Sequence, residues 1–502
     1  SPNIPLDEKG STDFLKSTSR TANTPQDTVT PGNDSERPHE PASPRSLPEL
    51  YREWVQSYSN RSKQYQTRLD AAWHTLLADI QLWQAAKSKD PVVRHHIIQF
   101  EQFATRAFEA LIDNQERRDA SNLAEVLDFR ALVIGVFTTQ WSLLRNVAQQ
   151  RIDDSPYRKG ILQLDKIVKQ NYARLYAVIN PKLKVDKQDR HLPSAPLMTF
   201  APLVYLGNAG KLTVFNRRVP LMLSVPLAAL PGNPEAELAQ MAIPHETAHA
   251  LFSQIPELIE EIGSKLDDAL HNGVIRSPLT GKVLTARETL IYRMTFEWIE
   301  EICADLFGTA LAGEAFARSA RWAMLSSEDT AGITDKTHPP TIIRPLVHLL
   351  ALSTIESEDK RFEETRKQFQ EEIDQASAQG VGELSLNRRF RSVPALIFVR
   401  LATVSTILSD VVTRILTMQL ATLKGAALSS VLREIYALKK ATLPADALLP
   451  AWGEDPTITS ESFVLDFPAE LFPSYTTPGV TVRPDGWDIP IIRDILSLLG
   501  KK

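Results

Sequence analysis

The sequence predicts a mainly α-helical fold with a small β-sheet. Apolar residues such as Leu69, Trp73 and Leu76 recur at three- and four-residue steps over long stretches, which is the period of an amphipathic helix. The clearest short β-type runs are confined to residues 197–227. The chain of 502 residues has 43% hydrophobic and 23% charged residues, which is ordinary for a globular protein with a large core.

Charge and cysteine content argue against several classes of protein. The net charge of −5 argues against nucleic acid as the main partner, because nucleic-acid-binding domains usually carry a basic stripe. Cys303 is the single cysteine, so the chain can form neither an intrachain disulfide nor a cysteine-based zinc finger, and a reducing, cytoplasmic compartment is expected. No stretch approaches the roughly 18–20 uninterrupted apolar residues of a transmembrane helix.

Composition divides the chain into five expected segments. The first fifty residues contain eight Pro and a single aromatic residue, Phe14, so they offer too little apolar surface to offset the entropy of ordering. The last sixty residues are again rich in Pro. The segments are a disordered tail (1–46), a helical bundle domain (47–190), a central core (191–352), a C-terminal helical region (353–440) and an irregular C-terminal segment (441–502).

The bundle domain is expected to hold four or more antiparallel helices. Helical periodicity extends from residue 47 to about 183, with strong apolar runs over 123–144 and 161–178. Short polar breaks such as 153–156 separate the runs, and short connections place sequential helices antiparallel.

Three β-type runs predict the small sheet. They are Leu203–Leu206, Leu212–Phe215 and Leu221–Val225, and connections containing Gly, Asn or Arg separate them.

Helices are expected to resume after residue 353. Residues 356–374 are dense in both charge signs, which is typical of a solvated helix face. Two more apolar helices are expected over 396–423 and 427–438.

One motif indicates metal chemistry. His245, Glu246 and His249 form the pattern H-E-x-x-H. On a helix, imidazoles at positions i and i+4 lie on one face and can bind a single zinc ion, while the Glu beside the first His lies over the metal-bound water. The motif therefore predicts a zinc site.

The residues around this motif predict the helix that it needs. A helix is expected over 236–252, with Asn233 as its N-terminal cap. Pro244 should interrupt this helix just before His245, because proline removes a backbone donor. The metal-binding segment is expected to begin at that break.

A second helix is expected to supply a third ligand. A catalytic zinc site uses three protein ligands and leaves the fourth position to water. The expected helix covers 286–312; it begins at a capping box formed by Thr285 and Glu288 and ends before Gly313.

Glu301 is the predicted third ligand on this helix. Glu301 and Asp305 lie four residues apart and share a face, so Glu301 can reach the metal while Asp305 holds a histidine ring. Glu300 is expected to point elsewhere. Cys303 lies about 200° around the helix from Glu301, so it is predicted to be a packed core residue.

Three landmarks resemble the gluzincin metallopeptidases, most closely the group of HtpX and the CaaX prenyl proteases. They are the Thr-Ala pair between the two histidines, the E-x-x-A-D motif of Glu301–Asp305 and the His-Pro element of Thr337–Arg344. They occur in the family's order within residues 203–349, less than a third of the chain. The resemblance implies a zincin-like core, here flanked by N- and C-terminal helical regions, in a soluble variant of the family.

The resemblance also implies roles for two further residues. His338 is expected to hydrogen-bond the oxyanion or to block the metal in a resting state, and Arg344 to hold the loop; alternatively, the turn Thr337–Pro340 only caps a helix. About fifty residues separate His249 from Glu301, which leaves room for a lid or a specificity insertion.

The sequence as a whole predicts a zinc-dependent endopeptidase that acts on a protein or peptide substrate. His245, His249 and Glu301 are expected to hold one Zn²⁺, with Glu246 as general base. The run Leu221–Val225 is expected to offer a sheet edge to an extended peptide. The alternatives are a catalytically silent or latent zinc-binding scaffold, and a delivered effector protease that uses residues 1–46 as its delivery tail.

Overall fold

The computed structural model describes residues 47–86, 123–186, 211–213, 222–234, 236–325, 333–334, 339–355, 383–390 and 393–448, with shorter pieces of 93–109, 188–207 and 364–371. By its internal contacts the chain divides into two units, Ser1–Asn60 and Arg61–Lys502. The expected tail over 1–46 and residues 449–502 lie outside the described residues. The domain boundaries expected at 190 and 352 stay predictions.

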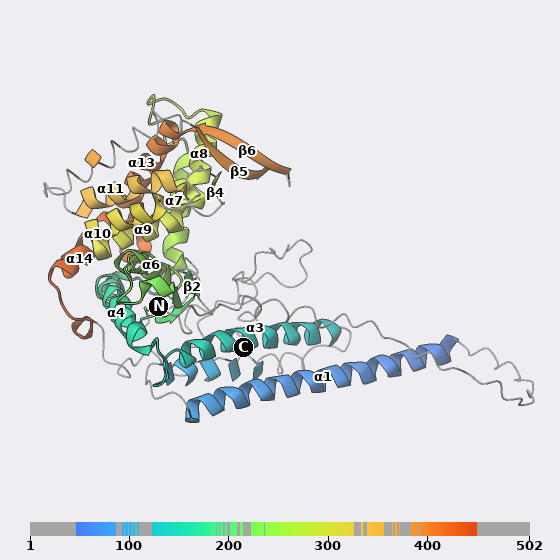
Figure 1. The fold of residues 1–502 in the computed structure, drawn as a ribbon. Helices are drawn as coiled ribbons and strands as arrows, with labels where there is room; N and C mark the ends of the chain where they lie inside the picture. The colour runs from blue at the N-terminus through green and yellow to red at the C-terminus, as the bar shows by residue number, and fades with distance from the viewer. Residues whose placement is uncertain are drawn as a thin grey trace, which may run out of the picture. The chain divides into compact units, whose positions relative to one another are not determined.

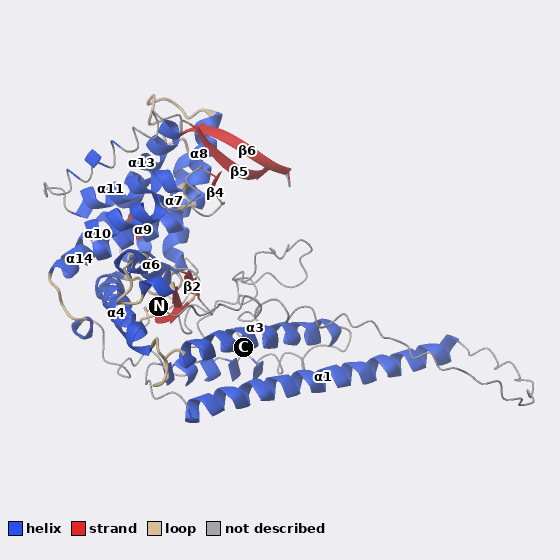
Figure 2. Cartoon of the chain, in the orientation of Figure 1, coloured by secondary structure: helices blue, strands red, loops and turns tan. Residues whose placement is uncertain are grey.

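The described part of the chain is mainly helical and contains small sheets, as predicted (Figures 1 and 2). Its α-helices are α1 (Leu47–Ala86), α3 (Leu123–Gln149), α4 (Arg158–Ile179), α5 (Ala236–Gln240), α6 (Ile243–Phe252), α7 (Pro256–His271), α8 (Ala286–Glu297), α9 (Ile299–Ala312), α10 (Glu314–Leu325), α11 (Arg344–Ile355), α13 (Leu401–Thr417) and α14 (Leu428–Lys440). Its strands are β1 (Leu203–Leu206), β2 (Lys211–Thr213), β3 (Met222–Val225), β4 (Ile333–Thr334), β5 (Glu383–Phe390), β6 (Val393–Arg400), β7 (Gln419–Leu420) and β8 (Ala426–Ala427). No helix in these ranges combines the length and the apolar character that crossing a bilayer requires.

Helices α1 and α3 share an aromatic core. Trp73 of α1 stacks on Phe108, with ring centroids 4.3 Å apart, and meets Phe137 of α3 edge to face. The buried Arg130 of α3 pairs with Asp70 of α1 at 2.5 Å, so a charge that would be costly to bury alone has its counter-ion.

The predicted small sheet is confirmed, and its two faces bury different cores. Leu203 and Tyr205 pack into the core of α1 and α3, whereas Val204 packs against Ile161 and Leu164 of α4. This alternation follows from the two-residue period of a strand. The sheet therefore joins the N-terminal helices to α4.

The order of the strands corrects one expectation. The order is β1–β3–β2, with β1 parallel and β2 antiparallel to β3, so the described part of the run expected over Leu221–Val225, strand β3, is central and pairs with a strand on each side. The edges belong to β1 and β2. Strand order depends on long-range pairing, which a run of apolar residues does not encode.

Helix α9 lies at the centre of the largest core. It packs against α6, α7, α8, α10, α11 and α14, and eleven of its residues, from Ile299 to Leu311, are buried. The exposed residue of its first turn is Glu300. A helix that is apolar on nearly every side is stable only when neighbours surround it.

Two expected helices differ from the structure. The helix expected over 286–312 is interrupted at Trp298, which separates α8 from α9. The helix expected over 396–423 begins only at Leu401 and ends at Thr417, because Val393–Arg400 pairs with β5 as strand β6. A short, continuous apolar run is compatible with a buried strand and with a buried helix, and here cross-strand pairing selects the strand.

Candidate metal centre

The first two ligands lie on α6, which begins where predicted. Helix α5 ends at Gln240, α6 starts at Ile243, and Pro244 occupies its first turn, where a missing backbone N–H costs nothing. His245 and His249 follow one turn apart, with ring centroids 4.8 Å apart.

A glycine permits α9 to approach this helix closely. A Cβ atom at Gly308 would lie 3.3 Å from the backbone nitrogen of His245 and 2.8 Å from the ring of Phe316. Any larger residue would have to displace one of these groups. Gly308 thus allows α9 to bring its own side chains up to the histidines.

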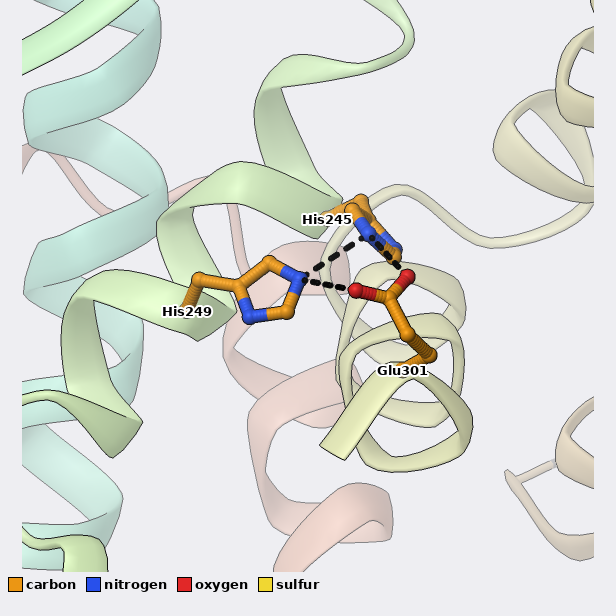
Figure 3. Close-up of side chains that lie close together, drawn as sticks. All are labelled: His245, His249 and Glu301. Atoms are coloured by element: carbon orange, nitrogen blue, oxygen red, sulfur yellow. Dashed lines mark hydrogen bonds and ion pairs between the residues drawn. The ribbon is translucent and has the colours of Figure 1, made fainter. Parts of the chain in front are cut away.

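The ligands converge on one point. The Nε2 atoms of His245 and His249 lie 3.1 Å apart, and each lies 3.3 Å from a carboxylate oxygen of Glu301. Figure 3 shows the three side chains facing one another. One ligand atom from each residue lies within 4.8 Å of the others, a spacing that can hold a metal ion. The predicted trio is therefore assembled from α6 and α9.

Carboxylates hold both imidazole rings from behind. Nδ1 of His245 lies 2.9 Å from Asp305 Oδ1, and Nδ1 of His249 lies 2.9 Å from Glu300 Oε1. A ring that donates Nδ1–H to a carboxylate presents Nε2 as its free lone pair, which is the arrangement that metal-binding histidines use. Asp305 therefore has the predicted position.

The position of Glu300 corrects an expectation. The sequence predicts that Glu300 points elsewhere, whereas its carboxylate lies against Nδ1 of His249. The break at Trp298 places both Glu300 and Glu301 in the first turn of α9, where the helix dipole favours negative charge. The helix that we expected had no such break, so the sequence pattern gave no signal for this contact.

Arg344 of α11 completes the group behind His245. Its Nε lies 2.9 Å from Asp305 Oδ2 and its Nη2 lies 2.7 Å from Asp305 Oδ1, and Nη2 is 3.7 Å from Glu301. Asp305 is fully buried, so this bidentate pair compensates its charge. Arg344 lies near the site as the resemblance implies, but it binds a carboxylate rather than only a loop. His338 lies outside the described residues.

The electrostatics of the trio favour a positive charge at its centre. Burial disfavours the charged form of His249, but hydrogen bonds with Glu300 and Glu301 outweigh it and raise its pKa to about 10. The pKa of His245 is also raised, because Asp305 and Glu301 outweigh the effect of burial. The pKa of Glu301 is held well below its usual range, because its bonds to both histidines outweigh burial. A bound cation would replace the protons that the rings otherwise attract.

Glu246 lies on the same helix and is half-buried. Its charge raises the pKa of both His249 and Arg344. Its carboxylate is therefore close enough to influence His249 and Arg344 electrostatically, although it is not one of the three side chains that converge on the candidate metal position.

Replacing Asp305 with Asn should weaken metal affinity about 10–100-fold, the usual cost of losing a partner behind a ligand. The amide keeps the shape but removes the charge that orients His245 and pairs with Arg344. Competition with a chelator, on protein shown to be folded by circular dichroism, measures the effect. The exposed Asp268 gives the matched control, and equal affinity in folded Asp305→Asn and Asp268→Asn would contradict this role.

Cys303 should not react with iodoacetamide in the native protein. It is a buried free cysteine, and burial, with a contribution from Glu300, raises the pKa of its thiol well above the usual range. Mass spectrometry should find it alkylated only after denaturant is added. Rapid labelling of folded protein would show that the core around α9 is open.

Comparisons with models of protein families, with curated proteins and with solved structures give no match to this chain.

Proposed function

We propose that the protein is a zinc-dependent peptidase of gluzincin type. The observation that supports this most strongly is the convergence of His245, His249 and Glu301 within 4.8 Å on two helices. Two imidazoles and a carboxylate are the protein ligands of the His₂Glu class of catalytic zinc site. The substrate proposed is a protein or a peptide.

The donor set fits zinc better than a harder cation. Mg²⁺ and Ca²⁺ prefer shells made mainly of oxygen, whereas imidazole nitrogen suits zinc and similar transition metals. Three protein ligands leave one position for water or substrate, which distinguishes a catalytic site from a closed structural one. The carboxylates behind His245 and His249 are the outer partners that such ligands require.

The mechanism assigns each residue a separate task. Bound zinc would polarise the scissile carbonyl and acidify a water molecule. Glu246 accepts the proton of the attacking water on its carboxylate and later delivers it to the leaving amine. Asp305 and Glu300 keep the two rings in the orientation that presents Nε2. Arg344 neutralises Asp305 and keeps that carboxylate from attracting a proton.

The proposed place for substrate is the edge of β2. Helix α6 packs against β2, and among the described strands β2 pairs only with β3. An extended peptide can add to such an edge through main-chain hydrogen bonds, which would place it beside α6. This assignment replaces the one expected for Leu221–Val225.

The direct test measures metal and turnover on one preparation. The purified protein should hold about one zinc per chain, as a site of this class does, and should cleave members of a broad peptide library. Zinc bound in full without cleavage of any peptide would favour the scaffold alternative. Absence of bound zinc, after dialysis against zinc, would overturn the proposal.

A further inference from the structure

The connection between α7 and α8 exposes an unusual number of apolar side chains. Ten large apolar side chains are exposed in the described part of the chain, and three of them lie within ten residues of this connection. They are Val274 at 63%, Leu279 at 52% and Val283 at 72% exposed, and Val283 is the most exposed of the ten. Single exposed apolar residues are normal, whereas a group of them indicates an interaction surface.

The connection is held in a defined conformation. Helix α7 ends at His271 and is followed by Gly273 at φ 65°, and the N–H groups of Gly273 and Val274 donate to the carbonyls of Leu270 and Ala269. This pattern of bonds is a Schellman motif. The start of the loop is therefore fixed by the end of the helix.

The tip of the loop is closed by hydrogen bonds. The N–H of Ser277 donates to the carbonyl of Lys282, and the N–H of Gly281 donates to the carbonyl of Ser277. The buried hydroxyl of Ser277 donates to Glu288 in the capping box of α8. Ile275 is 2% exposed and anchors the loop to the main core. These hydrogen bonds and the buried Ile275 fix the conformation of the loop, so the exposure of Leu279 follows from a defined backbone.

The charged residues within the loop itself are basic, whereas Asp267 and Asp268 precede it and the buried Glu288 follows it. Residues 269–287 contain no Asp or Glu, and the exposed Arg276, Lys282 and Arg287 lie among the three aliphatic residues. The whole chain carries a net charge of −5, whereas this segment carries a net positive charge.

The loop is not a lid over the metal centre. Helix α7 starts four residues after α6 ends and has 16 residues, so it carries the chain about 24 Å along its axis before the loop begins. Figure 2 shows the connection in tan where α8 begins. The lid or specificity insertion expected between His249 and Glu301 is therefore a helical hairpin with an apolar, basic tip.

We propose that residues 272–285 dock the protein on the surface of an anionic lipid bilayer. Aliphatic side chains of such a loop can enter the boundary between headgroups and acyl chains, while Arg276 and Lys282 extend to the anionic headgroups. A stable protein interface needs about 800 Å² on each partner and is enriched in aromatic residues. This loop is short and has no aromatic residue, so a membrane fits it better than a protein partner.

The test is sedimentation of the full chain with vesicles. Vesicles of about 30% phosphatidylserine in phosphatidylcholine should bind the protein, and pure phosphatidylcholine should bind it much less, since each cation near an anionic surface contributes about fivefold. Replacing both Arg276 and Lys282 with Gln should lower binding about 30-fold by the same reckoning. The double variant Leu279→Ser/Val283→Ser should lower it at least about tenfold.

A matched variant distinguishes the loop from the rest of the surface. Leu82 of α1 is 58% exposed, so Leu82→Ser removes a comparable side chain from a different element and should bind as wild type does. The proposal is overturned if the wild type does not bind anionic vesicles, or if the loop variants bind as well as Leu82→Ser. It is also overturned if the loop variants instead abolish a concentration-dependent dimer, which would make a second copy the occupant. Glu246→Gln should bind vesicles normally, so this inference and the proposed catalysis fail separately.

Discussion

Replacing Glu246 with Gln should lower peptide turnover by about 10²–10⁴-fold and leave the metal in place. This range is the usual contribution of general acid–base catalysis. The amide keeps the size of the side chain but cannot accept a proton from the attacking water. Because Glu246 is not one of the three converging side chains, zinc content should stay near that of the wild type. Zinc content and cleavage are measured on the same preparations.

The control for this prediction is Glu260→Gln on α7. Glu260 is exposed and lies outside the centre, so its variant should cleave peptides at the wild-type rate. Equal turnover in Glu246→Gln and Glu260→Gln, on a peptide that the wild type cleaves, would exclude Glu246 as the base. Loss of zinc in Glu246→Gln would show that the residue holds the metal instead.

Replacing Glu301 with Gln should remove most of the metal, whereas Glu300→Gln should cost no more than about 10–100-fold in affinity. The two residues are neighbours in the first turn of α9, so the pair is a matched comparison. Glu301 faces both Nε2 atoms, while Glu300 touches only Nδ1 of His249 and is 55% exposed. Equilibrium competition with a chelator separates a ligand from a residue that orients one.

The reverse result would exchange their roles. If Glu300→Gln loses the metal and Glu301→Gln retains it, the side chain of Glu300 must swing to the Nε2 side when the ion binds. Both variants should remain folded, since neither substitution changes the volume of a buried apolar group, and a thermal melt followed by circular dichroism verifies this.

Much of the metal centre could be predicted because its residues lie close together in the sequence, in pairs on single helices. Residues four apart on a helix share a face, and this rule alone pairs His245 with His249 and Glu301 with Asp305. The start of α6 at Ile243, with Pro244 in its first turn, and the capping box of α8 also follow from short-range chemistry. These features do not depend on the rest of the fold.

The remaining features depend on contacts that the local sequence does not encode. Residues 396–400, which the apolar pattern predicts as the start of a helix, belong instead to strand β6, because pairing with β5 decides their conformation. The central place of β3 results from pairing with strands on either side. Glu300 meets His249 only because the chain breaks at Trp298, with φ −97° and ψ 5°, and redirects the first turn of α9.

The close contact at Gly308 bears on which ions the protein can select. The ligands lie on two helices that approach closely at Gly308, where a Cβ atom would lie 3.3 Å from the backbone nitrogen of His245, so a change in the distance between His245 and Glu301 would require the surrounding core to repack. An ion that needs longer bonds or six to eight ligands would have to separate these helices. A small ion that needs only four ligands fits the observed spacing. Selection among metals would therefore depend on the rigidity of the backbone as much as on the chemistry of the side chains.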